Sequence, residues 1–174
     1  MPSLRVPSVE VHASFVEAMA EFLAEGRGSP DDATLVGSEL RDDRWRTPAG
    51  FADFIASLHA EAEQPRQAGW VTQSTWWWCE GSVFLGRIAL RHELTDSLRA
   101  EGGHIGYDVR PSARRRGHAT AMLAAVLPHA RAMGIDAVLL TCDASNVASR
   151  RVIEANGGER QDEFRGRFRY WIEL

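Results

Sequence analysis

The sequence predicts a mixed α/β sheet flanked by helices, and three observations support this fold class. Two segments with helical periodicity come first, a hairpin pattern occupies residues 70–90, and a strand–helix–strand crossover follows at residues 104–141. The chain has 174 residues, of which 44% are hydrophobic, and this is enough for one core. We therefore expect a single domain over residues 1–174.

The first part of the chain is predicted to form two amphipathic helices. Apolar side chains recur at helical spacing in residues 11–24, and Gly26 closes that segment. A second helix begins at Thr47 and Pro48, a capping residue followed by a proline in the first turn. Residues 29–46 between them are expected to form a loop or a short helix.

Strand-forming residues then dominate, which predicts a hairpin. Residues 70–78 and 83–90 are rich in aromatic and β-branched side chains, and a turn at Gly81 separates them. The run Trp76–Trp78 alternates across the first strand, so at least one tryptophan faces the core and at least one faces outward. An exposed aromatic surface is the basis for expecting a homodimer.

The crossover follows the hairpin. A strand over residues 104–110 stops before a proline, a helix begins near Arg115, and residues 137–141 form a buried strand. Pro128 lies inside the helical pattern and predicts a kink or an early end. A further helix over residues 146–155 and a terminal hairpin over residues 159–174 complete the order of elements.

Charge and composition exclude several classes of function. The formal net charge is −4 and all 20 basic residues are arginine, so we expect no nucleic-acid partner. No apolar run is long enough to span a bilayer and the first residues lack a secretory pattern, so we expect no membrane partner and a cytoplasmic location. Cys79 and Cys142 have no disulfide or metal-binding spacing, so we expect two reduced thiols and no metal site.

The most informative segment is the turn between the strand at residues 104–110 and the next helix. It contains three consecutive arginines, Arg114, Arg115 and Arg116, followed by Gly117. Unpaired amides and the helix dipole favour a phosphate at such a helix start, and glycine lets the backbone approach it closely. The alternative is a solvated basic turn that caps a helix.

The order of the motifs resembles the GNAT superfamily of N-acetyltransferases over about residues 70–174. The two motifs that carry the resemblance are Arg114-x-x-Gly117-x-Ala119 and Asn146-x-x-Ser149, each of which follows a predicted strand. Segments 86–94 and 102–107 further resemble a subgroup of predicted bacterial acetyltransferases. The resemblance implies a mostly antiparallel sheet with a splayed parallel pair of strands in the crossover.

The resemblance implies acetyl-CoA as the co-substrate. The coenzyme would lie between the splayed strands, with the backbone near Val109 pairing with its pantetheine arm. Asn146 and Ser149 would contact it from the opposite side, and Asn146 also suits an N-cap of the following helix. The residues of the turn expected to contact the coenzyme are Arg114, Arg115, Arg116, Gly117, His118, Ala119 and Thr120.

Catalysis by direct attack of an amine on the thioester needs a base for the ammonium proton. The candidates near the splayed strands are Glu93, His92, His104 and Asp108. The unperturbed pKa of histidine favours a histidine over Asp108. His104 and Glu93 are the residues that we predict for this role.

The acid that protonates the leaving thiolate is also expected to differ from the usual one. Many family members have a tyrosine about seven residues after the asparagine, where this chain has Ile153. Tyr107, on the strand beside the expected coenzyme, is the predicted substitute, and water is the alternative. A covalent route through Cys142 lacks a partnered base.

The acceptor is expected to be the primary amine of a small molecule. A protein N-terminus or lysine side chain is the alternative acceptor, and a non-catalytic acyl-CoA-binding module is the alternative to an enzyme. Acidic and aromatic residues of the first long loop are expected to receive a cationic ligand, namely Asp31, Asp32, Asp42, Asp43 and Trp45.

Overall fold

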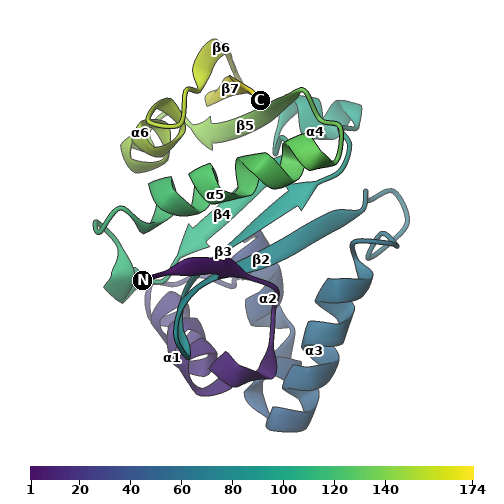
Figure 1. Ribbon diagram of the computed structural model, residues 1–174, viewed down its shortest axis with the longest axis vertical. Helices are drawn as coiled ribbons and strands as arrows, with labels where there is room; N and C mark the ends of the chain where they lie inside the picture. The colour runs from purple at the N-terminus through teal and green to yellow at the C-terminus, as the bar shows by residue number, and fades with distance from the viewer.

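The computed structural model describes all 174 residues and contains two antiparallel sheets (Figure 1). The first sheet has the strand order β1-β2-β3-β4, with β1 at Ser3–Arg5, β2 at Gln73–Glu80, β3 at Val83–Arg91 and β4 at Ile105–Val109. The second has the order β5-β7-β6, with β5 at Ala137–Asp143, β6 at Glu159–Phe164 and β7 at Arg167–Glu173. The helices are α1 at His12–Ala24, α2 at Leu35–Arg41, α3 at Pro48–Ala60, α4 at Asp96–Ala100, α5 at His118–Ala132 and α6 at Val147–Glu154.

Two apolar cores lie on opposite faces of the first sheet. Helices α1, α2 and α3 pack on one face, where Phe15 and Phe51 surround Trp77 with ring centroids 5.1 and 5.7 Å away. Helix α5 packs on the other face, where Met122 lies in the same cluster as Ile88 of β3 and residues of β7. One core therefore binds the helical layer to the first sheet, and the other joins the two sheets through α5.

The tryptophan run does not present the outward surface that the sequence predicts. Trp77 and Trp78 are 1% and 6% exposed, and they face opposite cores as the alternation requires. Trp76 is half-buried and packs against His129 of α5, with ring centroids 4.8 Å apart. The homodimer remains a prediction without this support.

The helices and strands otherwise follow the predicted order, with local differences. Strand β2 begins at Gln73 rather than Trp70, and α5 continues through Pro128 to Ala132. The helix tolerates Pro128 because this residue and Ala124 are exposed, so the carbonyl that loses its intrahelical partner can bond to water. The two elements not predicted, β1 and α4, are only three and five residues long.

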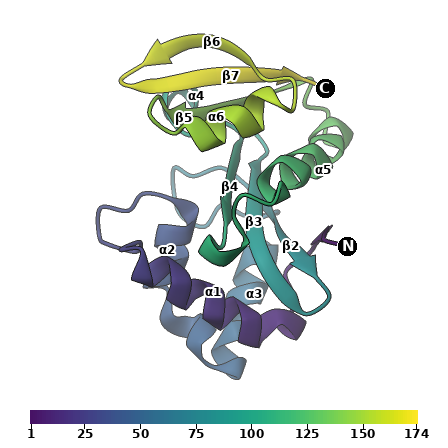
Figure 2. The same ribbon diagram turned by 90° about the vertical axis from the view of Figure 1, so that its left-hand side faces the viewer.

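The two sheets separate between β4 and β5. No ladder joins these strands, and a single isolated bridge connects Gly103 to Leu140, in the antiparallel sense. Gly103 has φ of +67°, and a Cβ there would stand 2.3 Å from the carbonyl oxygen of Leu139, so glycine alone fits this approach. Figure 2 shows the second sheet lying across the end of β4 rather than continuing the first sheet alongside β4. The predicted splay is thus complete, with no parallel pairing.

His104 completes the junction at this bridge. Its amide donates to the carbonyl oxygen of Leu139 at 2.7 Å, and the Leu139 amide donates to His104 Nδ1 at 2.9 Å. A ring that accepts at Nδ1 carries its proton on Nε2 and is neutral. Burial, reinforced by Arg99 and Arg91, lowers the pKa of His104 to about 4. The neutral ring therefore ties the sheets together.

Replacing His104 by asparagine should make the protein less sensitive to acid. In the unfolded chain the histidine has a pKa of about 6.5 and is protonated below that pH, whereas the folded ring stays neutral. The free energy of unfolding therefore falls as the pH drops below about 6.5. Between pH 7 and pH 5 this loss is about 2 kcal/mol. Asparagine keeps an acceptor oxygen and does not titrate. Urea unfolding at both pH values should show a smaller loss in His104→Asn, and equal losses would contradict the neutral buried ring.

Candidate active site

A cavity of about 970 Å³ opens where the two sheets separate. Its walls come from β4, from the turn leading into α5 and from the first turns of α6. Every residue predicted to contact the coenzyme lines it except Arg116. The cavity residues that the sequence predicted are Tyr107, Val109, Arg114, Arg115, Gly117, His118, Ala119, Thr120, Asn146 and Ser149.

The turn before α5 presents a row of unpaired backbone donors. The amides of residues 115–120 donate no hydrogen bond to another group of the protein, and the first amide of this helix that does so is that of Ala121. Arg115 and Gly117 have φ of +62° and +79°, the left-handed conformations found in anion-binding nests. A Cβ added at Gly117 would meet nothing within 4 Å. The free amides, the helix start and the open space fit a pyrophosphate.

The side chains of the arginine triplet are not equivalent. Arg114 is paired with Glu25 at 2.5 Å and donates from Nε to the carbonyl oxygen of Val109 at 3.1 Å. Arg115 and Arg116 make no ion pair and are exposed. Arg115 and Arg116 are thus the two members of the triplet without an ion pair, and of these only Arg115 lines the cavity. Arg114 instead holds the turn against α1 and β4.

Tyr107 bridges the break between the sheets. Its hydroxyl lies 2.8 Å from Ser149 Oγ on α6, and burial raises the pKa of Tyr107, so the phenol keeps its proton at neutral pH. The Ser149 amide in turn donates to Asn146 Oδ1 at 3.0 Å, so Asn146 is the N-cap of α6 as well as a cavity residue. Ser149 is thereby fixed opposite β4.

Asp108 lines the same cavity from the other face of β4. Consecutive strand residues point to opposite faces, so Asp108 lies on the side of α1–α3 while Tyr107 reaches α6. Arg27 Nη1 approaches Asp108 Oδ1 at 3.4 Å, and Arg87 is its register partner on β3. Burial raises the pKa of Asp108 although both arginines oppose this. The unperturbed pKa of aspartate ranks Asp108 below histidine as a candidate base. The position of Asp108 on the predicted strand beside the coenzyme is the sequence feature that points to it.

The two predicted bases do not lie in the cavity. His104 is 7% exposed and its acceptor nitrogen is occupied by the Leu139 amide. Glu93 is exposed in the loop between β3 and α4. Neither residue lines the cavity wall, because the first lies at the bridge before β4 and the second beyond the end of β3.

Three of the five residues expected to receive a cationic acceptor have other partners, and none of the five lines the cavity. Trp45 is 2% exposed and donates from Nε1 to the carbonyl oxygen of Glu39. Asp32 pairs with Arg27 at 2.9 Å, and Asp42 with Arg44 at 2.5 Å. Of these pairs, only Arg27 reaches the cavity.

Two other positions singled out by the sequence are buried. Ile153, which stands where many family members have a tyrosine, is 1% exposed and belongs to the core on the α5 face. Cys142 is 4% exposed, burial raises the pKa of its thiol, and it does not line the cavity. Both cysteines are free.

No three His, Cys, Asp or Glu side chains are grouped as metal ligands. No helix has the length and apolar character needed to cross a membrane.

Comparisons with known proteins agree with this geometry. A family model described as an acetyltransferase (GNAT) domain matches residues 17–159. No curated protein matches the chain.

Solved structures share the fold at low sequence identity. Mycobacterium smegmatis RimJ in complex with CoA-disulfide is 19% identical with a TM-score of 0.70, covering 99% of this chain and 82% of that one. The microcin C7 self-immunity acetyltransferase MccE, in complex with acetyl-CoA and AMP, is 10% identical with a TM-score of 0.66, covering 99% and 92%. The ribosomal-protein-S5-alanine acetyltransferase from Vibrio fischeri is 10% identical with a TM-score of 0.68, covering 99% and 92%. The chain belongs to the GNAT family of acetyltransferases, which use acetyl-CoA as the acyl donor.

Proposed function

We propose that this chain transfers the acetyl group of acetyl-CoA to the primary amine of a small molecule, with both substrates bound in one ternary complex. One observation carries the proposal: a row of free amides, a protonated phenol and a half-buried carboxylate all border the same cavity. The free, buried cysteines support a reducing compartment such as the cytoplasm.

The coenzyme would be held by the turn and by the free edge of β4. The amides of residues 115–120 would bind its pyrophosphate, with added charge from Arg115 and Arg116. Strand β4 is the last strand of its sheet, so its outer edge near Val109 has no partner strand and can face an extended pantetheine arm, although the Val109 carbonyl oxygen also accepts a hydrogen bond from Arg114. When bound, the thioester supplies an activated acetyl group.

Asp108 is the base in this proposal. An alkyl amine with a pKa near that of lysine is neutral in only about one part in a few thousand at pH 7, so its proton must be removed before it can attack. A raised pKa makes the Asp108 carboxylate a better proton acceptor than an exposed aspartate. Asp108 first takes one proton from the ammonium group, and the neutral amine then attacks the acetyl carbon. The nitrogen–carbon bond forms as the carbon–sulfur bond breaks, and the nitrogen loses its second proton to water. Water then takes the proton from Asp108 and returns one to Tyr107 after the phenol has protonated the sulfur.

Tyr107 is the acid that completes the exchange. Its raised pKa keeps the phenol protonated, and the hydroxyl of Ser149 at 2.8 Å orients it. The phenol gives its proton to the leaving sulfur. The base and the acid approach the reacting centre from opposite faces of β4. Asp108 can therefore exchange a proton with the amine while Tyr107 exchanges one with the thiolate.

A protein N-terminus is the second candidate acceptor. It is favoured by the fold likeness to an enzyme named as a ribosomal-protein-S5-alanine acetyltransferase. The small-molecule acceptor is favoured by Arg27, which hydrogen-bonds to Asp32 and Thr34 and also to Asp108 at 3.4 Å, so its side chain occupies space beside this carboxylate in the cavity wall.

Gly117→Trp should abolish coenzyme binding while the fold persists, because the indole would occupy the phosphate position. Gly134→Trp is the matched control: Gly134 follows the other end of α5, has the same φ of +79° and also has open space around its Cβ. Both variants carry a similar backbone strain of about 1 kcal/mol. Calorimetry with acetyl-CoA should detect binding in Gly134→Trp alone. Unchanged affinity in Gly117→Trp would overturn the assignment of the turn.

Tyr107→Phe should lower kcat roughly a hundredfold and change the Kd for acetyl-CoA little, since a general acid acts mainly in the transition state. Tyr170→Phe is the control, because Tyr170 is the other tyrosine and bonds to Glu154 outside the cavity. Steady-state rates with one amine, beside the Kd, separate the two effects. A Tyr107→Phe variant as fast as Tyr170→Phe would remove Tyr107 as the acid.

Thiol release from acetyl-CoA should depend on an added amine and should be highest with a compact one. The panel comprises polyamines, amino acids, aminoglycosides and peptides with free or blocked N-termini. Because the chain contains no lysine, acetyl-lysine found by mass spectrometry must belong to an added peptide. Turnover confined to peptides with a free N-terminus would replace the small-molecule acceptor with the protein one. Binding of acetyl-CoA without turnover on any amine would favour the non-catalytic module.

A further inference from the structure

A fully buried ion pair lies next to the proposed base. Glu39 on α2 approaches Arg87 on β3 with 2.8 Å between Oε1 and Nη1, and the two side chains are 0% and 1% exposed. Every other ion pair of the molecule includes a more accessible side chain. A buried ion pair is seldom more stabilising than apolar residues of the same volume. The presence of one beside Asp108 therefore points to a role other than stabilising the fold.

Arg87 is shared between two carboxylates. It is the register partner of Asp108 across β3 and β4, and side chains directly opposite in an antiparallel pair have Cβ atoms about 5 Å apart on one face. Its single hydrogen bond runs from Nη2 to Thr75 Oγ1 at 3.3 Å. The guanidinium therefore acts on Glu39 and Asp108 mainly through its charge. Electrostatic interactions between such groups are strong because solvent is excluded around them.

We propose that Glu39 is a positioning residue for acetyl transfer: by neutralising Arg87, it determines how much positive charge faces Asp108. This inference rests on the proposed role of Asp108 as the base. When Glu39 is ionised, Arg87 is balanced and the Asp108 carboxylate accepts a proton more readily. When Glu39 is neutral, the whole charge of Arg87 stabilises the Asp108 carboxylate and weakens it as a base.

The surroundings allow the charge of Glu39 to vary near neutral pH. Burial raises the pKa of Glu39 to about 7, against the attraction of Arg87 and Arg66. Both Glu39 oxygens lack a hydrogen-bond partner. The charged groups that face Glu39 are Arg87, Arg66, Glu61 and Asp108, and those that face Asp108 are Arg27, Arg87 and Asp32.

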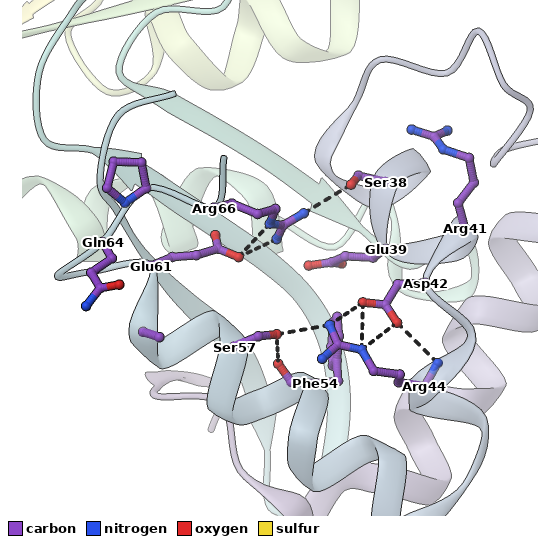
Figure 3. A pocket seen from close by; sticks show the side chains of 12 residues that line it. Ser38, Glu39, Arg41, Asp42, Arg44, Phe54, Ser57, Glu61, Gln64 and Arg66 are labelled. Atoms are coloured by element: carbon purple, nitrogen blue, oxygen red, sulfur yellow. Dashed lines mark hydrogen bonds and ion pairs between the residues drawn. The ribbon is translucent and has the colours of Figure 1, made fainter. Parts of the chain in front are cut away.

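A second cavity, of about 520 Å³, lies between α2 and α3 beside this pair. Figure 3 shows Glu39 on its α2 wall and Arg66 between Glu61 and Ser38. Arg66 is held at 2.6 Å from Glu61 and 3.0 Å from Ser38, so its charge is largely balanced and Arg87 is the cation that Glu39 controls. Glu39 therefore lies in the wall of this second cavity and not in that of the cavity between the two sheets.

The test is the pH dependence of kcat/KM in variants of this pair. Glu39→Gln leaves the charge of Arg87 unbalanced, which lowers the pKa of Asp108. The acidic limb of the kcat/KM profile should therefore move to lower pH by about one unit, and the plateau value of kcat/KM should fall roughly threefold. Arg87→Met removes the cation, so the limb should move to higher pH. In the double variant Glu39→Gln with Arg87→Met, the limb should follow Arg87→Met alone, because a buried Glu39 that has lost Arg87 is neutral and adds no charge of its own.

Two further results separate the possible failures. Asp108→Asn with wild-type activity would overturn the proposed base itself. Asp108→Asn without activity, together with an unmoved limb in Glu39→Gln, would overturn the role of Glu39 alone, since a structural role lowers the active fraction without shifting the limb. If Glu39→Gln does not fold, the limb of Arg87→Met decides: a shift to higher pH supports the proposal, and no shift overturns it.

Discussion

The fold depends on a break in strand pairing. The first sheet ends at β4 and the second begins at β5, and one bridge between Gly103 and Leu140 joins them. The core formed around α5 holds the sheets together, so β4 can remain unpaired along its outer edge. An unpaired edge beside a helix start is a set of backbone donors and acceptors, and this is where we propose that acetyl-CoA binds.

Strand alternation explains how one short strand can carry both of the proposed catalytic residues. Tyr107 and Asp108 are adjacent in sequence and therefore lie on opposite faces of β4, in contact with different layers. Tyr107 meets Ser149 of the second sheet's helix, whereas Asp108 meets Arg27 and Arg87 of the helical layer and β3. Burial raises both pKa values, and for the carboxylate this means a gain in basicity. The phenol is protonated at neutral pH in any case, so the proposed role of Tyr107 as the acid depends on its position beside Ser149.

The parts of this account that the sequence predicted are local in the chain. Periodicity and turn residues indicate the main elements, and the coenzyme turn is contiguous, so its motif is visible directly. Elements as short as β1 and α4 give too weak a pattern. His104 and Glu93 were chosen on residue type, which carries no information on burial or on whether the Leu139 amide occupies the ring. The pairing of Glu39 with Arg87 depends on tertiary contact between α2 and β3, and no local pattern predicts it.

The central claim is that the amides of the turn before α5 bind the coenzyme in the break between the sheets. Hydrogen–deuterium exchange of these amides, with and without saturating acetyl-CoA, tests it most directly. The account predicts that exchange slows in the segment 114–120, where the amides of residues 115–120 have no partner within the protein, and stays unchanged around Gly134 at the far end of the helix. Unchanged exchange in the segment 114–120 at full saturation would contradict it.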